Sequence, residues 1–262
     1  MLKIATPVSD LFREKKYAKV LIENSDCLEI RDRSRGSDYP NEEIFHCELQ
    51  PIHKLTGESF EYLQKIKNMH LDLKLVTFHC ASSCDKPYIE NNMFQLNGAN
   101  YEKQELLENA MCNFSKIKKI FGKEVKIGIE NNNYYPTEAY KYIAEPSFIS
   151  DIIYINELYF LFDIAHARIA AFNKSMDYGE YKRGLPLDRI IQLHISTYNI
   201  RNGLAYDIHD YPNKEIFNEV KEIINKYDVK YLTVEYYKDV NNLLVSLHRL
   251  KEIIDEFHGA AI

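Results

Sequence analysis

The chain has 262 residues, of which 45% are hydrophobic and 27% are charged. Barrels of about 250 residues commonly form one domain, so we expect a single domain over residues 1–262. The formal net charge of −6 gives no overall attraction to phosphate backbones, and nucleic acid is not an expected partner.

Cysteine usage and the absence of long apolar runs indicate a cytoplasmic protein. The cysteines are odd in number and lack paired CxxC spacing, so neither a disulfide framework nor a thiolate zinc site is expected. They are Cys27, Cys47, Cys80, Cys84 and Cys112. We find no charged-then-apolar leader, and no apolar run approaches the roughly 20 residues of a membrane span.

Short strand-like segments alternate with longer helical segments along the chain, which is typical of βα units around a parallel sheet. Strands are predicted over residues 3–8, 27–32, 43–49, 74–80, 125–131, 159–166, 190–196 and 230–237. Eight strands are what a closed (β/α)8 TIM barrel requires. Amphipathic patterns predict outer helices over 101–121, 213–227 and 240–257. The longest irregular stretch, 81–100, follows the fourth strand, where such barrels carry functional loops.

Histidines and carboxylates recur at or just past the ends of these predicted strands. They are His46, His79, Glu130, Asp163, His166, His194, Asp207, His209 and Glu235. Because the carboxyl ends of barrel strands converge, these side chains are expected to meet in one bowl. Their joint placement carries the prediction, since a single histidine is more often structural than a ligand.

Strand alternation separates inward from outward side chains. Val125, Ile127 and Ile129 are expected to face the helices, which leaves Glu130 facing the interior. The same pattern directs Glu235 inward.

Alternation also separates two histidines from the cysteines that follow them. His46 and His79 are expected to face inward, and Cys47 and Cys80 to pack against the helices as core residues. Cys84 lies in a loop near the bowl and is interpreted as an incidental loop residue, with a reactive thiol as the alternative.

Imidazoles and carboxylates suit zinc, iron and manganese, and carboxylates can bridge two ions. Nine such groups exceed the needs of one ion, so a cluster of metal ions is predicted. The other histidines are interpreted as surface or structural residues, and Tyr134 and Tyr135 as candidates to line the pocket. These histidines are His53, His70, His248 and His258.

Four segments resemble the xylose-isomerase-like barrel superfamily and, within it, the multinuclear non-heme iron-dependent oxidases of the methanobactin-biosynthesis type, which modify ribosomally made peptides. They are Ile129-Glu-Asn-Asn, Phe160-Leu-Phe-Asp-Ile-Ala-His166 followed by Asn173, Leu185-Pro-Leu-Asp-Arg-Ile-Ile-Gln-Leu-His194, and Asp207-Ile-His-Asp-Tyr-Pro212. The similarity covers most of the chain. Two positions depart from the family pattern, because Gln192 stands where Glu or Asn is frequent and Ser196 replaces a small Ala-Gly stretch.

The resemblance implies an oxidase with two or three iron ions (Fe2+/Fe3+) and O2 as co-substrate. It would modify a residue, expected to be cysteine, of a ribosomally synthesised precursor peptide, helped by a separate small peptide-recognition protein. Carried over by position, the family's ligands form three groups: a first group of His46, His79 and Glu130, a second group of Glu130, Asp163, His194 and Glu235, and a third group of His166, Asp207 and His209.

Three other interpretations use the same residues. A trinuclear-zinc phosphodiesterase of the apurinic-endonuclease type shares the ligand layout, although the sequence pI near 5.9 opposes DNA binding. A divalent-metal sugar isomerase or epimerase would use paired carboxylates for proton transfer, but leaves the third group without a role. A metal-storage or scaffold protein is the third, against which the open bowl argues.

Overall fold

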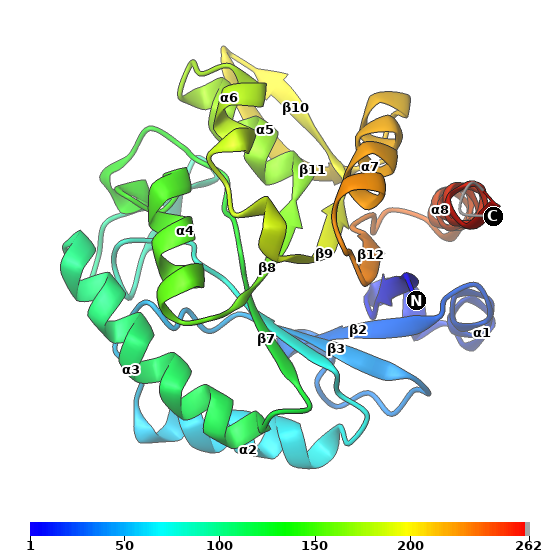
Figure 1. Cartoon of the computed structure of the whole chain (residues 1–262), viewed down its shortest axis with the longest axis horizontal. Coiled ribbons are helices and arrows are strands. Elements are labelled where there is room, and N and C mark those ends of the chain that lie inside the picture. Colours follow the sequence, from blue (N-terminus) through cyan, green and yellow to red (C-terminus); the bar gives the residue numbers. More distant parts are fainter. Residues whose placement is uncertain (260–262) are drawn as a thin grey trace.

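Eight parallel strands close into a barrel in the order β1-β12-β9-β8-β7-β4-β3-β2 (Figure 1). The computed structural model describes residues 1–259. The barrel strands are β1 (Lys3–Pro7), β2 (Cys27–Arg31), β3 (Glu42–Cys47), β4 (Leu75–Phe78), β7 (Lys126–Glu130), β8 (Tyr159–Asp163), β9 (Ile190–Ile195) and β12 (Tyr231–Val234). The predicted (β/α)8 barrel is confirmed. Each strand ends one to three residues before its predicted end, where the chain leaves the sheet.

Helices cover the outside of the barrel (Figure 1). They are α1 (Lys15–Glu23), α2 (Gly57–Met69), α3 (Lys103–Phe121), α4 (Pro146–Ile155), α5 (Ile164–Asn173), α6 (Tyr178–Arg183), α7 (Lys214–Lys226) and α8 (Val240–Gly259), with short 3-10 turns η1 (Asp10–Arg13), η2 (Asp32–Ser34), η3 (Glu138–Tyr140) and η4 (Leu187–Arg189). The three helices predicted from amphipathic patterns are α3, α7 and α8. Within residues 1–259, none of the helices combines the length and apolar character of a membrane span.

Polar side chains fix where two of these helices begin. The Thr56 side chain accepts a hydrogen bond from the backbone N–H of Ser59 at the start of α2. Asn213 accepts one from Ile216 at the start of α7. Such caps satisfy backbone donors that have no partner inside the helix and contribute about 1 kcal/mol each.

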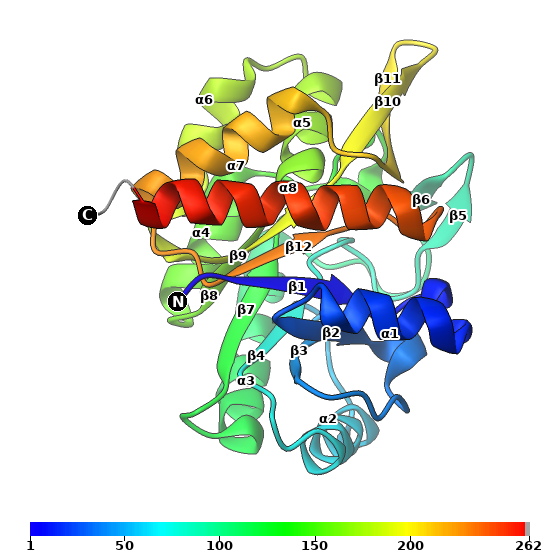
Figure 2. The ribbon, with the colours of Figure 1, turned by 90° about the vertical axis from the view of Figure 1, so that its right-hand side faces the viewer.

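Two antiparallel hairpins were not predicted. One pairs β5 (Tyr88–Glu90) with β6 (Met93–Gln95) inside the loop after β4, and the other pairs β10 (Thr197–Arg201) with β11 (Leu204–Asp210) after β9. Figure 2 shows both hairpins on the side toward which β1 points, which is the carboxyl end of the barrel strands. They therefore stand beside the end of the barrel where the predicted ligands gather.

The barrel interior changes from apolar to polar along its axis. At the amino end of the strands a small cluster of buried apolar side chains fills the interior: Ala5, Cys27, Ile44, Leu75, Ile191 and Tyr231. The larger apolar core lies between the strands and the helices and includes Cys47 and Cys80, as alternation predicts. Inward positions nearer the carboxyl end carry polar groups such as Glu29, His46 and Thr77, all buried.

Candidate metal centre

Six of the predicted ligands lie in the last residues of barrel strands or directly after them. Glu130 and Asp163 are the last residues of β7 and β8, His46 and His194 lie within β3 and β9, and His79 and Glu235 follow shortly after β4 and β12. Parallel register places partners side by side, as Asp163 pairs with His194 across β8 and β9. The barrel thus brings distant parts of the sequence to one bowl.

Three predicted ligands do not lie at barrel strand ends. The strand predicted over residues 159–166 was too long: β8 ends at Asp163, whose side chain accepts a hydrogen bond from the backbone N–H of His166 at 2.7 Å and caps α5. His166 therefore lies in the first turn of a helix. Asp207 and His209 lie on hairpin strand β11 and not just past a barrel strand. All three side chains nevertheless reach the bowl.

The first group is built around Glu130. Its Oε2 lies 3.5 Å from Nε2 of His46 and 3.1 Å from Nδ1 of His79. Nδ1 of His46 lies 2.8 Å from the Thr77 hydroxyl, which leaves Nε2 directed at the carboxylate. Burial, together with the neighbouring His79, lowers the pKa of His46 to about 4, so its ring is neutral at physiological pH, as a metal ligand must be.

The second group surrounds Nδ1 of His194. This atom lies 3.0 Å from Glu130 Oε1, 3.3 Å from Glu235 Oε1 and 4.0 Å from Asp163 Oδ2. Asp163 Oδ2 is buried and has no hydrogen-bond partner in the described part of the chain. Burial, opposed by His166, raises the pKa of Asp163 to about 7. A buried carboxylate oxygen without a donor fits a site that takes a cation.

The third group joins α5 to the hairpin. Nε2 of His166 lies 3.5 Å from Asp207 Oδ2, and Nε2 of His209 lies 3.1 Å from the same oxygen. His209 Nε2 also lies 3.3 Å from Glu235 Oε2, which links this group to the second. The backbone of His209 has φ 42° beside a register shift in the β10–β11 pairing, the kind of irregularity that redirects a side chain.

Atomic spacing alone also permits a set of Glu130, Asp163 and His166. Nδ1 of His166, however, lies 3.0 Å from the carbonyl oxygen of Asn131, to which it can donate. That hydrogen bond leaves Nε2 as the free ring nitrogen, and Nε2 faces Asp207. The geometry therefore favours His166 in the third group.

The charge of the bowl is strongly negative. Five carboxylates contact the clustered histidines or the guanidinium of Arg31: Glu29, Glu130, Asp163, Asp207 and Glu235. Although burial opposes it, these carboxylates raise the pKa of His166 and His194, so cation binding there would release protons. This donor set, rich in imidazole and carboxylate and without thiolate, fits one or more divalent or trivalent metal ions.

Two charged residues of the site, Glu29 and Arg31 of β2, were not predicted from the sequence. Glu29 is fully buried and Arg31 pairs with both Glu29 and Glu235. Burial opposes ionisation of Glu29, but Arg31 and His194 outweigh it and lower the pKa of Glu29 to about 2. The signal was present, because Glu29 and Arg31 alternate with Leu28 and Ile30 and alternation directs them inward.

The remaining predicted side chains have other surroundings. His53 and His70 are buried and hydrogen-bonded to the Ser82 carbonyl and to Glu42, respectively, away from the predicted ligands. His248 contacts Asn24 at the surface. The side chain of His258 lies outside the described residues.

The two aromatic residues after β7 and the loop cysteine singled out from the sequence differ in their surroundings. The Tyr135 hydroxyl accepts a hydrogen bond from the backbone N–H of Asp207 at 3.3 Å and so supports the hairpin. Tyr134 lines an outer hollow of about 710 Å³ against the β5–β6 hairpin. Cys84 is fully buried and packs against Tyr135 and Tyr140.

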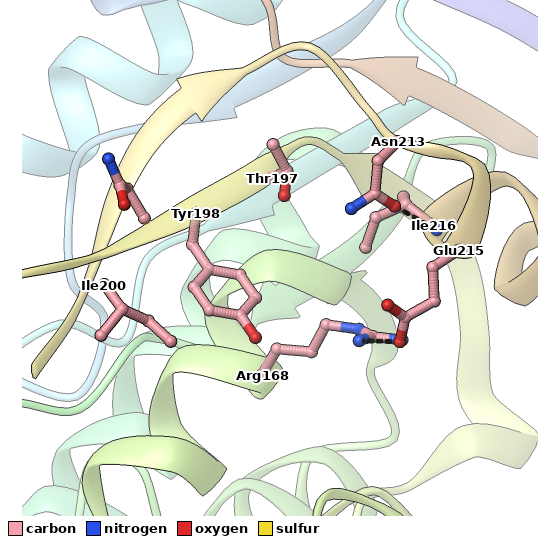
Figure 3. Close-up of a pocket in the computed structure, with 8 residues that line it drawn as sticks. Arg168, Thr197, Tyr198, Ile200, Asn213, Glu215 and Ile216 are labelled. Carbon is pink, nitrogen blue, oxygen red and sulfur yellow. Dashed lines mark hydrogen bonds and ion pairs between the residues drawn. The ribbon is translucent and has the colours of Figure 1, made fainter.

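A separate hollow of about 330 Å³ lies behind the β10–β11 hairpin (Figure 3). Arg168 of α5 points across it toward Glu215 of α7, at 2.6 Å. Tyr198 and Ile200 of β10 line the opposite side. No predicted ligand lines this hollow, so it is distinct from the bowl.

Comparisons with known proteins place this chain in a family. A family model described as RiPP precursor modification enzyme MbnB/TglH/ChrH matches residues 53–256. A UPF0276 protein from Caulobacter vibrioides is 32% identical over 84 residues, which are 32% of this chain and 30% of that protein. The alignment with this curated relative therefore spans less than a third of the relative's length.

Solved structures share the barrel. The 3-keto-D-glucoside 4-epimerase YcjR from E. coli matches with a TM-score of 0.64 and 12% identity, over 97% of this chain and 100% of its own. A xylose isomerase-like TIM barrel protein from Mycobacterium smegmatis, in complex with magnesium, matches with a TM-score of 0.51 and 11% identity, over 94% and 80%. At such identities the likeness shows the fold alone, and it confirms the xylose-isomerase-like barrel.

Proposed function

Since this chain belongs to the MbnB/TglH/ChrH family of RiPP precursor modification enzymes, we propose that it is a multinuclear iron-dependent oxidase. In this proposal it uses O2 to modify a cysteine of a ribosomally synthesised precursor peptide. The three ligand groups defined above would hold two or three iron ions, and a separate small protein would help to present the peptide.

One observation carries the proposal: the three groups adjoin and share carboxylates. Glu130 reaches the first group through Oε2 and the second through Oε1. Glu235 reaches the second through Oε1 and the third through Oε2. Carboxylates that present their two oxygens to different neighbours are suited to bridging adjacent ions.

Oxidation of a peptide removes electrons from it, which selects among the metals that this donor set accepts. Bound iron would supply one-electron redox steps and open positions for substrate and O2, whereas zinc has no redox chemistry. The ligand set itself suits either metal. The family membership and the need for electron transfer are the supports for iron.

The chain's own residues orient the centre and limit its contact with water. His46, His194 and Asp163 are at most 2% exposed, so their donor atoms are shielded from solvent. The side chains of His79 and His209 are 29% and 37% exposed. A peptide would therefore reach the centre from the side of these two histidines, between the loops at the carboxyl end of the strands. A substrate thiol bound there would lose its proton, because a coordinating thiol is deprotonated.

The epimerase alternative rests on a shared fold, which many unrelated activities use. An epimerase needs a pair of proton-transferring groups and one or two ions. The contacts of His166 and His209 with Asp207 would then serve no chemical step, whereas a multinuclear oxidase uses them.

The test is to load the purified chain with Fe2+ under anaerobic conditions and to add cysteine-containing peptides synthesised from any short reading frames found beside its gene. Mass spectrometry should show a change confined to the cysteine-containing fragment that needs both iron and O2. The same change without O2, or with zinc in place of iron, would contradict the oxidase proposal.

Matched variants sharpen this test. His46→Ala removes a buried first-group ligand and should abolish the change. His248→Ala alters a surface histidine that contacts Asn24 and should leave it intact. Equal activity in both variants would show that the reaction does not need the first group.

A further inference from the structure

His194 uses both ring nitrogens, and they face different surroundings. Nδ1 is directed at Glu130 and Glu235, at 3.0 and 3.3 Å. Nε2 lies on the other side of the ring, 3.0 Å from Glu29 Oε2. The ring is fully buried, so water does not compete for either nitrogen.

We propose that Glu29 is a positioning residue. It accepts a hydrogen bond from Nε2–H of His194 and so holds the ring with Nδ1 directed at the metal ions. This inference rests on the proposed metal centre, and it assigns to Glu29 no metal ion of its own. Histidines that bind metal almost always donate their other ring N–H to a carboxylate, carbonyl or water, which fixes the tautomer and the ring orientation.

The oxygens of Glu29 already have partners. Oε1 accepts hydrogen bonds from Nε and Nη2 of Arg31, at 2.9 and 2.6 Å. Oε2 accepts one from Nε2 of Gln192 at 2.6 Å and faces His194. A carboxylate so occupied differs from Asp163, whose Oδ2 has no hydrogen-bond partner in the described chain. Glu29 is therefore suited to orienting a ligand and not to holding an ion.

The position of Arg31 supports the same conclusion. Spacing alone would allow an ion among Glu29, His194 and Glu235. The Arg31 guanidinium, however, contacts both Glu29 and Glu235 and supplies a positive charge between them. A cation placed between Glu29 and Glu235, beside the guanidinium, would be repelled, so His194 is left to bind the ion of the second group through Nδ1.

The Gln192 side chain, at a position that departs from the family pattern, is hydrogen-bonded to Glu29. Its Nε2 donates to Glu29 and, at 2.8 Å, to the Thr233 hydroxyl, so it holds Glu29 of β2 from β9. A neutral amide can donate to Glu29 without adding a further negative charge. The side chain of Gln192 therefore affects the ligand His194 indirectly, through Glu29.

The test uses Zn2+ as a diamagnetic probe and measures its binding by competition with a chelator. Glu29→Gln keeps the shape of the side chain and removes the charge. It should weaken one bound ion ten- to a hundredfold, the usual effect of losing such a partner. His194→Ala should weaken the same ion, and the double variant should bind no more weakly than His194→Ala. Additional loss in the double variant would make Glu29 a direct ligand and overturn the inference.

Two controls separate positioning from general damage. Glu219→Gln alters another buried carboxylate, paired with Arg168 and Lys182, and should leave Zn2+ affinity unchanged. If Glu29→Gln lowers the unfolding free energy but not the affinity, Glu29 is only structural.

A measurement on the unmodified protein keeps the inference testable even if the variant does not fold. In 15N-histidine spectra of the zinc-loaded chain, the His194 signal, identified by its loss in His194→Ala, should carry its proton on Nε2. A proton on Nδ1 would refute the inference. A chain that binds no zinc at all would contradict the proposed metal centre itself, and so these two failures are distinct.

Discussion

His166 in the first turn of α5 and Asp207 on hairpin strand β11 face each other across 3.5 Å, from Nε2 to Oδ2. The other ring nitrogen of His166 is engaged by the Asn131 carbonyl. This pairing ties the hairpin, which lies outside the barrel sheet, to the centre inside it. It also distinguishes a site of three ligand groups from one of two.

Replacing Asp207 by Asn should remove about one metal ion per chain and leave the fold intact. The neutral amide is a poorer ligand, while the side chain is only 11% exposed and keeps its shape. Metal analysis with circular dichroism of the same sample measures both effects. The matched control is Asp210→Asn on the same strand, which pairs with Lys238 at the surface and should keep full metal content. Equal content in both variants would count against the third group.

Glu130→Gln should cost more metal than His79→Ala. Glu130 contacts the first and second groups, whereas His79 contacts only the first in the described structure. We expect loss of about two ions for Glu130→Gln and of one for His79→Ala, measured by elemental analysis after the same dialysis. A loss of one ion in each would mean that Glu130 does not bridge.

Metal removal should destabilise the chain, because the buried carboxylates then lack their cations. Metal at a hundredfold excess over its Kd contributes about 2.7 kcal/mol per site, so a chelator should lower the unfolding temperature reversibly. An unfolding temperature that is the same with and without the chelator would indicate that the bowl holds no metal.

Asp163→Asn should make the metal-free chain more stable at pH 8. Burial raises the pKa of Asp163 to about 7, above its usual 3.8, so the ionised form at pH 8 opposes folding and the neutral amide relieves that cost. The gain over the chelator-treated parent should be at least about 1.4 kcal/mol, the value of one pKa unit. Urea unfolding of both proteins measures it, and a less stable variant would refute the prediction.

A pH effect away from the centre is expected from His70 and Glu42. Their 2.8 Å contact raises the pKa of His70 above 6.5, while burial of Glu42 is outweighed by His70, which lowers the pKa of Glu42 below 4.5. The pair therefore stabilises the folded chain fully between about pH 4.5 and 6.5. This stabilisation is lost as the pH rises through the pKa of His70 in the folded chain. His70→Gln should lower the unfolding free energy by about 2 kcal/mol at pH 5.5 and by less at pH 9.

His53→Gln should show the opposite dependence of stability on pH. Burial lowers the pKa of His53. Below pH 6.5 the unfolded chain therefore binds a proton that the folded chain does not, and this lowers the free energy of unfolding. The stability lost in this variant should therefore be smaller at pH 5.5 than at pH 9. The same trend in both variants would contradict the assignment of the His70–Glu42 pair.

The barrel and most of its ligands were predictable because strand alternation is a local property. The rule that turned Glu130 inward and Cys80 outward needs only neighbouring residues. It applied equally to Glu29, which was missed because it lies in mid-strand and not at a strand end. Strand ends were misjudged where a cap intervened, as at Asp163, whose role in starting α5 depends on a side-chain hydrogen bond.

The hairpins and the roles of individual ring nitrogens were not predictable. The β10–β11 pairing places Asp207 opposite Tyr198 through a register shift, which depends on contacts between separate segments. Likewise, the choice of Nδ1 or Nε2 at His194 depends on Glu29 and Glu130, which come from strands far apart in the sequence. Such choices arise only when the barrel closes.

The central claim is tested most directly by metal analysis and Mössbauer spectroscopy of the chain purified under anaerobic conditions. We predict two or three iron ions per chain, with spectra of magnetically coupled iron held by nitrogen and oxygen ligands. Stoichiometric zinc without iron would contradict the proposed oxidase.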